Sequence, residues 1–154
     1  MSVFHVATLC SGSRGNAVYV EYDGVRLLFD CGMSRKRLSA ALAAYGTEIG
    51  ALDGIFITHE HTDHVSGLRM NCKYDAPPVH ITETSARAYC LANGITTPEC
   101  FVRHMPGDTV AVGSVTVTSF ATQHDSRASV GYRVETPTHT VGIATDMGCV
   151  SDGI

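Results

Sequence analysis

Apolar residues follow two different periods along this chain. In the first part, short apolar runs alternate with segments in which apolar residues recur at helical spacing, whereas from Cys100 onward apolar and polar residues alternate with a period of two. Strands are predicted at residues 3–9, 17–22, 25–30, 53–58, 79–81, 110–112, 115–121, 130–135 and 140–145. The segments of helical spacing predict amphipathic helices at residues 34–45 and 82–93.

Turn-forming and helix-capping residues stand at the boundaries of these segments. Asp23-Gly24 separates the second and third predicted strands, and this dipeptide is a strong signal for a two-residue hairpin. Ser34 stands where an N-cap of the first helix belongs. Gly46 and Gly94 follow the two predicted helices, at the position where glycine ends many helices.

The order of these elements favours a layered domain. A third helix is expected directly after the strand at 53–58, capped by Thr62 or Asp63 and continuing through Leu68 or beyond. Strands alternate with helices first and antiparallel strands follow, which indicates an α/β or α+β fold with helices covering sheet faces. No repeat or linker divides the chain, so residues 1–154 are expected to form one domain.

Charge and hydropathy narrow the classes of partner. The formal net charge is −4, so the protein does not attract nucleic acid by bulk charge, and a polyanionic substrate would depend on metal ions and a local basic patch. No apolar stretch approaches the roughly 20 residues that span a bilayer. The N-terminus lacks the charged and apolar regions of a secretory signal. We therefore expect a cytoplasmic protein with no membrane partner.

The six cysteines contain no Cys-x-x-Cys pair, which argues against a zinc knuckle or a thioredoxin-like site. A disulfide framework is typical of small secreted proteins, so free thiols that pack as small hydrophobic residues are the favoured interpretation. Cys31 is the cysteine of most interest, because it follows Asp30 near the site proposed below.

The densest group of chemically active side chains is a six-residue run, His59-Glu60-His61-Thr62-Asp63-His64. It follows the apolar strand at 53–58, and imidazole and carboxylate groups suit zinc, manganese or iron. In a tight turn, His59 and His61 can point to one metal while Asp63 and His64 point to a second. A chain of this composition is expected to contain such a run by chance roughly 10⁻³ times, so the alternative of a surface histidine turn is disfavoured.

Two later residues stand at the ends of predicted strands. His124 follows the strand at 115–121, and Asp146 follows the strand at 140–145. Taken singly, each is more often an ordinary loop residue. Folds gather ligands at strand ends from distant parts of the sequence, so we predict that both join the cluster as metal ligands.

These residues resemble the signature of the metallo-β-lactamase superfamily. The run from His59 to His64 looks like its metal motif, and His124 and Asp146 match its third histidine and its bridging aspartate. Asp30 resembles the upstream aspartate that supports the metal loop in this superfamily. The resemblance implies a metallo-β-lactamase αβ/βα sandwich, within the α+β class.

A narrower resemblance is carried by three further motifs. Ser11-Gly12-Ser13-x-Gly15-Asn16, Phe29-Asp30-Cys31-Gly32 and Thr145-Asp146-x-Gly148-x-Val150-Ser151 are similar to the YycJ/WalJ branch. Members of that branch are cytoplasmic bacterial proteins described as DNA exonucleases. The resemblance extends over essentially the whole chain.

One feature of the superfamily pattern is missing. Its site usually ends with another histidine late in the second half of the fold, and no such histidine follows Asp146. We therefore expect this chain to correspond to the first half to two thirds of the usual fold. The first metal would be held by His59, His61, His124 and Asp146, and the second, with only Asp63, His64 and Asp146, is predicted to be occupied more weakly. A second copy of the chain is a candidate to cover the face that the missing half leaves.

Two divalent ions would supply a strong nucleophile at neutral pH, because metal binding lowers the pKa of water from about 16 to near 7. Asp63 is predicted to be catalytic, since it can orient the resulting hydroxide as well as bind metal. Zinc is the favoured metal, with manganese and iron as alternatives. This chemistry opens phosphodiesters, thioesters, lactones or β-lactams, so the ligands leave the substrate open.

Basic and small residues favour a phosphate-containing substrate. Ser13, Arg14 and Asn16 lie in a loop of small residues whose backbone N–H groups could approach an anion, although a flexible strand connection explains the loop equally well. Arg35-Lys36-Arg37 stands in the first turn of a helix, where cations oppose the helix dipole, and Arg127 follows His124. A nucleic-acid backbone is one explanation of this placement, and a solvated run of charges is the other.

Three functions remain open on the sequence. The leading hypothesis is a metal-dependent phosphodiesterase, a DNA exonuclease by the resemblance to the YycJ/WalJ branch. The alternative enzyme is a thioester or lactone hydrolase of the glyoxalase II type. The third is an inactive metal-binding module, because the last ligand is missing.

Overall fold

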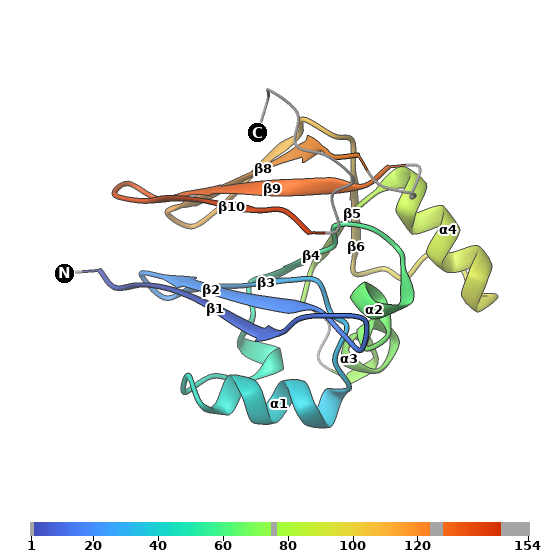
Figure 1. Ribbon diagram of the computed structural model, residues 1–154, viewed down its shortest axis with the longest axis horizontal. Helices are drawn as coiled ribbons and strands as arrows, with labels where there is room; N and C mark the ends of the chain where they lie inside the picture. The colour runs from blue at the N-terminus through green and yellow to red at the C-terminus, as the bar shows by residue number, and fades with distance from the viewer. Residues whose placement is uncertain (1, 75–76, 124–127, 146–154) are drawn as a thin grey trace.

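The computed structural model describes residues 2–74, 77–123 and 128–145 of the chain. Figure 1 shows two β-sheets stacked face to face, with α1 on the outer side of the first sheet and α2, α3 and α4 at one end. The elements are β1 (Phe4–Cys10), β2 (Ala17–Tyr22), β3 (Val25–Phe29), α1 (Arg35–Ala43), a 3-10 turn (Ile49–Ala51), β4 (Gly54–Phe56), α2 (Thr62–Val65), α3 (Leu68–Tyr74), β5 (Val79–Thr82), α4 (Glu83–Asn93), β6 (Phe101–His104), β7 (Thr109–Val112), β8 (Val115–Ala121), β9 (Val130–Glu135) and β10 (Thr140–Ile143).

The first sheet has six strands in the order β1-β2-β3-β4-β5-β6. Its first three strands pair antiparallel, and β3, β4, β5 and β6 then pair parallel. The parallel pairs need long crossover connections, which carry the helices of the chain. The second sheet has four antiparallel strands in the order β10-β9-β8-β7. Strands alternate with helices and a separate antiparallel meander follows, so the α+β prediction is confirmed.

Alternation along the strands sends side chains into two separate apolar layers. Leu28 and Ile55 pack between the first sheet and the helices, together with Leu38 of α1. Phe29 and Phe56 point to the other face of the same sheet and pack against the second sheet. A sheet that is buried on both faces reads as a continuous apolar run, which explains the sequence of β3 and β4.

The predicted hairpin, the N-cap of α1 and the glycine end of α4 are confirmed, whereas α1 ends at Ala43, two residues before the predicted end at Tyr45. Asp23 and Gly24 both have positive φ, 49° and 79°, as a two-residue turn of the hairpin type requires. The Ser34 hydroxyl accepts a hydrogen bond from the backbone N–H of Arg37 and so caps α1. Gly94 ends α4 in the left-handed conformation, with φ 62°.

The predicted cap of the third helix is wrong. His61 occupies the N-cap position of α2 in an extended conformation, and neither Thr62 nor Asp63 caps the helix. The Asp63 carboxylate instead accepts a hydrogen bond from the Asn16 side chain at 3.1 Å. The helix is also broken after α2, because the N–H of Gly67 donates to Cys31 O at 2.9 Å rather than into the helix.

Strand β6 was not among the predicted strands. It lies at the edge of the first sheet, and of its four residues only Phe101 is buried, so its apolar pattern is weak. The predicted strands at 53–58 and 140–145 are present but shorter, as Gly54–Phe56 and Thr140–Ile143. Over the residues that the structure describes, every helix is too short or too polar to cross a membrane.

Candidate metal centre

The metal loop, residues 58–64, follows β4 and includes the first three residues of α2, at the end of the sandwich where the helices gather. The side chains of His59 and His64 are fully buried, whereas 26% of the Asp63 side chain is exposed. Buried imidazoles are uncommon without a specific partner or a bound ion. The loop therefore combines buried imidazole nitrogens with the Asp63 carboxylate, which reaches the surface.

The three histidines of the loop lie side by side. The ring centroid of His59 is 4.1 Å from that of His64 and 4.7 Å from that of His61. Asp63 Oδ2 lies 3.4 Å from His64 Nε2. Two donors at that separation can bind one cation together, as predicted for Asp63 and His64.

The inner nitrogen of each buried imidazole is held by an oxygen. His64 Nδ1 lies 2.7 Å from Asp30 Oδ2, and His59 Nδ1 lies 2.9 Å from the Thr58 hydroxyl. Because the carboxylate only accepts, His64 Nδ1 carries the proton and the lone pair falls on Nε2, the atom that a cation would use. Histidine ligands of protein metal sites are commonly held in this way, so these donors fit a divalent metal.

Asp30 connects the end of β3 to the metal loop. Its buried carboxylate accepts hydrogen bonds from the Thr58 N–H at 2.8 Å and from the Thr58 hydroxyl at 2.8 Å, in addition to the bond from His64. Burial raises the pKa of the Asp30 carboxyl, and the hydrogen bonds from His64 and Thr58 oppose that rise. The residue has φ 64°, a conformation that non-glycine residues rarely adopt and that clusters at functional sites. Its predicted role in supporting the loop stays a prediction, and these contacts are its support.

Backbone N–H groups from two other parts of the chain donate hydrogen bonds to the metal loop. Asn16 N donates to Asp63 O at 2.8 Å, and Cys31 N donates to His64 O at 2.8 Å. Gly32 N in turn donates to Asn16 O at 2.9 Å. A Cβ atom on Gly32 would lie 1.9 Å from Asp63 O, so only glycine fits there. This close packing explains why small residues stand at 11–16 and 31–32, in two of the three motifs that resemble the YycJ/WalJ branch.

The residues predicted to contact substrate differ in burial and in their neighbours. Asn16 turns its amide toward the loop, 3.1 Å from Asp63 Oδ2, which gives it a role in placing Asp63. Ser13 and Arg14 are exposed at the surface of the same connection. Arg127 lies outside the described residues. Substrate binding by these four residues stays a prediction.

His124 and Asp146, the predicted ligands from the second sheet, also lie outside the described residues. The residues that flank these two segments reach the metal loop. Val130 N donates to Thr58 O at 2.9 Å, and the Thr145 hydroxyl donates to the Thr58 hydroxyl at 3.4 Å. Across the described parts of the chain, no three His, Cys, Asp or Glu side chains form a ready-made metal site. The full ligand set and the number of metals therefore stay predictions.

Three contacts that hold the loop or its first neighbour are not among the sequence-based predictions. Thr58 joins Asp30 to His59 through its hydroxyl, and its place just before the first histidine was the available signal. The Tyr132 hydroxyl donates to Ile57 O at 2.6 Å across the two sheets, a pairing that nothing in the local sequence reveals. The Ser85 hydroxyl donates to Glu60 Oε2 at 2.7 Å, which links α4 to the loop.

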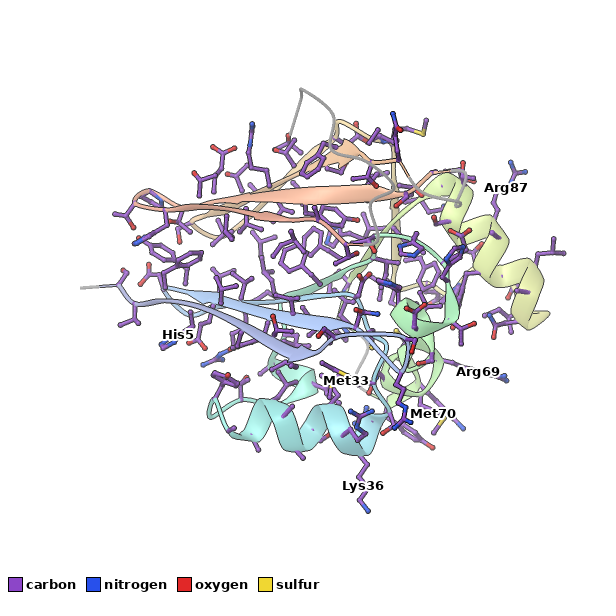
Figure 2. All side chains as sticks on the ribbon, in the orientation of Figure 1. His5, Met33, Lys36, Arg69, Met70 and Arg87 are labelled. Atoms are coloured by element: carbon purple, nitrogen blue, oxygen red, sulfur yellow. The ribbon has the colours of Figure 1, made fainter. Side chains whose placement is uncertain are left out.

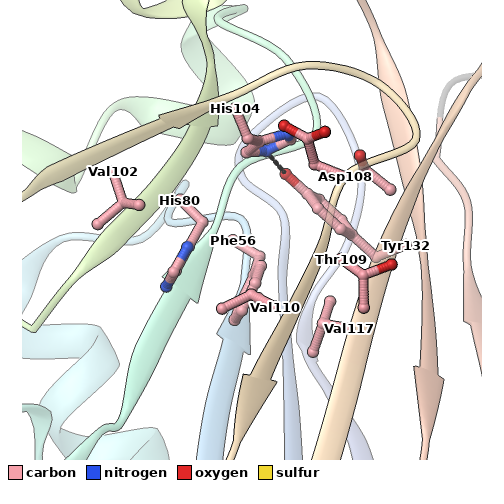
Figure 3. Close-up of a pocket in the computed structure, with 10 residues that line it drawn as sticks. Phe56, His80, Val102, His104, Asp108, Thr109, Val110, Val117 and Tyr132 are labelled. Atoms are coloured by element: carbon pink, nitrogen blue, oxygen red, sulfur yellow. Dashed lines mark hydrogen bonds between the residues drawn. The ribbon is translucent and has the colours of Figure 1, made fainter.

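A separate cavity of about 260 Å³ lies between the two sheets, near β6 and β7 (Figure 3). His80 stacks on Phe56 within it, with ring centroids 4.4 Å apart, and burial lowers the pKa of His80 to about 4. His104 Nε2 lies 3.1 Å from the Tyr132 hydroxyl, the contact dashed in Figure 3. No residue of the metal loop lines this cavity, so we place the candidate site at the loop.

Cys31 is a packing residue despite its position beside Asp30. Its side chain is fully buried, and its sulfur accepts a hydrogen bond from the Asn71 amide at 3.2 Å. Burial raises the pKa of the Cys31 thiol to about 12, so the group stays protonated at neutral pH. It therefore contributes no reactive thiolate to the site.

Known proteins resemble this chain in sequence and in fold. The β-lactamase superfamily domain matches residues 25–154. Exodeoxyribonuclease YycJ of Bacillus anthracis is 35% identical over 149 residues, which cover 96% of this chain and 56% of that protein. Exodeoxyribonuclease WalJ of Streptococcus pneumoniae is 31% identical over 151 residues, covering 97% of this chain and 56% of that protein.

Solved structures show the same architecture. A metallo-β-lactamase of Cronobacter sakazakii with a HARLDQ motif superposes with a TM-score of 0.75 at 17% identity, covering 90% of this chain and 58% of that one. The chain thus spans somewhat more than half the length of its relatives, in agreement with the expected half to two thirds. Because the superfamily domain matches most of the chain and the fold agrees with that match, the chain belongs to the metallo-β-lactamase superfamily.

Proposed function

We propose that this protein is a metal-dependent phosphodiesterase that degrades DNA from an end. The observation that carries the proposal is the metal loop, in which buried His59 and His64 have their Nδ1 atoms held by oxygens while Asp63 reaches the surface. The relatives that match nearly the whole chain are named exodeoxyribonucleases. Since the chain spans about 56% of those proteins, their activity is a proposal for this one.

The proposed ligand set divides into two groups. His59, His61, His124 and Asp146 would hold one divalent ion, and Asp63 and His64, together with Asp146, would hold the other. Zinc suits this mixture of imidazole and carboxylate, and manganese or iron would also fit. When bound, the ions would lower the pKa of a water molecule and stabilise charge on the attacked phosphorus.

Each described side chain has a distinct task in this proposal. Asp30 and Thr58 keep the lone pairs of the buried imidazoles on their Nε2 atoms. Asn16 holds the Asp63 carboxylate from the side at 3.1 Å. Asp63 accepts a proton from the attacking water or orients it, because its carboxylate is both fixed by Asn16 and open to solvent.

Cleavage assays distinguish this proposal from its alternatives. The zinc- or manganese-loaded chain is incubated separately with 5′-phosphorylated duplex DNA, with S-lactoylglutathione and with bis(p-nitrophenyl) phosphate. Progressive release of nucleotides from DNA supports the exonuclease, whereas hydrolysis of the thioester alone supports the glyoxalase II type. No turnover of any substrate, together with tight metal binding, supports the inactive metal-binding module.

The control variants separate the site from contamination. Asp63→Ala removes the proposed catalytic carboxylate, and we expect it to lower DNA cleavage by at least about 10². Glu48→Ala removes an exposed carboxylate whose side chain caps no helix, and it should leave the rate unchanged. Equal cleavage by the Asp63→Ala variant and the parent chain would show that the activity does not belong to this site.

A further inference from the structure

Six of the eleven basic residues come from three segments next to the metal loop. They are Arg14, Arg35, Lys36, Arg37, Arg69 and Lys73. No Asp or Glu occurs at residues 1–20, 31–47 or 64–74, the stretches that hold these cations, and Asp75, the next acid, lies outside the described residues. A chain with a net charge of −4 therefore presents a region of positive charge beside its candidate metal centre.

Contacts between the three segments make this region continuous. Arg37 Nη2 lies 3.6 Å from the sulfur of Cys10, at the start of the connection that carries Arg14. The Arg35 guanidinium and the Lys73 ammonium both lie 5.3 Å from the ring centre of Tyr74, which joins the start of α1 to the end of α3. Figure 2 shows Lys36 and Arg69 pointing away from the body of the molecule at this end.

The other cations that the structure describes lie near carboxylates. Arg103 pairs with Glu83 at 3.3 Å, and Arg133 pairs with Glu135 at 2.6 Å. Arg26 and Arg87 lie 3.9 Å from glutamate oxygens. Five basic residues of the region beside the metal loop are not paired in this way, because the described carboxylates form no ion pair with any of them. These five are Arg14, Lys36, Arg37, Arg69 and Lys73. Such cations are available to an external anion without first breaking an internal pair.

Two apolar side chains stand exposed among these cations. Tyr74 is 59% exposed and Met70 is 48% exposed, both on α3. Arg69 and Met70 also line a groove of about 270 Å³ that continues to Glu60 and Thr62 at the metal loop. Exposed aromatic rings between cations are typical of surfaces that bind single-stranded nucleic acids, because the bases stack while the phosphates meet the cations.

We infer that this surface binds single-stranded DNA and leads the strand end to the metal loop. We name it the basic platform, formed by Arg14, Lys36, Arg37, Arg69 and Lys73 around Tyr74. Asn16, which holds Asp63, lies in the same connection as Arg14, so the platform borders the proposed catalytic carboxylate. A duplex hides the faces of its bases, so Tyr74 favours a single strand over a duplex. The inference rests on the proposed function for its choice of DNA.

Binding is tested without cleavage, so that the two proposals fail separately. Fluorescence anisotropy of a labelled 12-nucleotide oligothymidylate is measured with the metal-free chain in EDTA, from 50 to 300 mM salt. Each phosphate contacted on a single strand adds about −0.7 to the slope of log K against log salt. We expect the double variant Arg69→Gln/Lys73→Gln to bind more weakly and to lose about 1.4 units of that slope.

A matched control removes the same charge from paired cations. The double variant Arg103→Gln/Arg133→Gln, two cations with carboxylate partners, should keep the slope of the parent chain. Urea unfolding of all variants verifies that they are folded. Equal slopes for the two double variants would overturn the platform, even if the metal-loaded chain cleaves DNA. Binding with the expected slopes but without cleavage would support the platform and contradict the proposed exonuclease.

Tyr74 tests the preference for a single strand. Tyr74→Ala should weaken oligothymidylate binding by roughly tenfold, whereas Tyr74→Phe, which keeps the ring, should bind like the parent. A duplex of the same length should bind the parent chain more weakly than the single strand does. Equal affinities of Tyr74→Ala and Tyr74→Phe, or equal affinities for duplex and single strand, would overturn the stacking role.

Discussion

Replacing Gly32 by alanine is the smallest change that should dislodge the metal loop. The added Cβ atom would lie 1.9 Å from Asp63 O and 2.6 Å from Asn16 N. Both neighbours are backbone atoms, and the hydrogen bond of 2.8 Å from Asn16 N to Asp63 O fixes them to each other. Neither can move by rotating a side chain, so the strain falls on the loop itself.

The geometry sets the size of the effect. The Asp63 carbonyl must retreat by roughly 1.5 Å to reach an ordinary carbon contact distance. Overpacking of this kind costs about 1–3 kcal/mol, and loss of one backbone hydrogen bond adds about 1 kcal/mol. We therefore expect Gly32→Ala to lower the free energy of unfolding by about 2–4 kcal/mol. The displaced Asp63 should also weaken zinc binding.

Urea unfolding followed by circular dichroism measures the stability, and competition with a chromophoric chelator measures the zinc affinity. Gly142→Ala in β10 is the matched control, because a Cβ atom there would meet no heavy atom within 4 Å. We expect this control to change the free energy of unfolding by less than about 1 kcal/mol and to leave zinc binding unchanged. If the two alanine variants have the same unfolding midpoint, the close approach of Gly32 to the loop does not constrain the protein.

Three further predictions concern buried polar groups. Asp30→Asn should weaken zinc binding by about ten- to a hundredfold, because an amide is a poorer acceptor for His64 Nδ1–H, and chelator competition would measure the change. His80 has its pKa lowered to about 4 by burial, so the folded state keeps it neutral while the unfolded state takes up a proton below pH 6.5. Lowering the pH from 7 to 5 should therefore cost up to about 2 kcal/mol of stability that the His80→Phe variant does not lose, as urea unfolding at the two pH values would show. Tyr132→Phe leaves the carbonyl of Ile57 without its 2.6 Å hydrogen bond and should cost about 1–3 kcal/mol, whereas an unchanged unfolding midpoint would contradict this.

The parts of the fold that the sequence predicts are those with local causes. The turn at Asp23-Gly24 follows from residues that accept positive φ, and the ends of α4 follow from Thr82 and Gly94. Strands 115–121 and 130–135 have the predicted bounds, because one face of each is buried and the alternation is clear. In each case the residues that determine the structure lie within the element itself.

The errors have non-local causes. The helix after the metal loop breaks because the Gly67 N–H bonds to Cys31 O, a residue 36 positions earlier in the sequence. Strand β6 depends on its parallel pairing with β5 more than on its own pattern. The sequence around Gly67 does not identify Cys31 as its hydrogen-bond partner, and the sequence of β6 does not identify β5 as its neighbouring strand.

The candidate site also has some features with local causes in the sequence and others with non-local causes. The run from His59 to His64 is visible because its donors are adjacent in the sequence, and Asp30 was found through the resemblance to a known family. The contact from Tyr132 to Ile57 joins two sheets and has no sequence signal of its own. The local sequence pattern therefore finds the groups that would meet a metal, whereas it does not reveal the hydrogen bond from Tyr132 that holds the start of the loop from the second sheet.

The groups that hydrogen-bond to the loop histidines determine which imidazole nitrogen is free to bind a metal. Thr58 shows how this works for His59. Its hydroxyl has a single hydrogen, which it donates to Asp30 Oδ2 at 2.8 Å, so toward His59 Nδ1, 2.9 Å away, it can only accept. His59 must then carry its proton on Nδ1, as His64 does through its own bond to Asp30. One buried carboxylate thus fixes the tautomers of both imidazoles, one of them through a hydroxyl. A cation arriving at the Nε2 side meets two lone pairs that are already in place, so no proton has to move before binding.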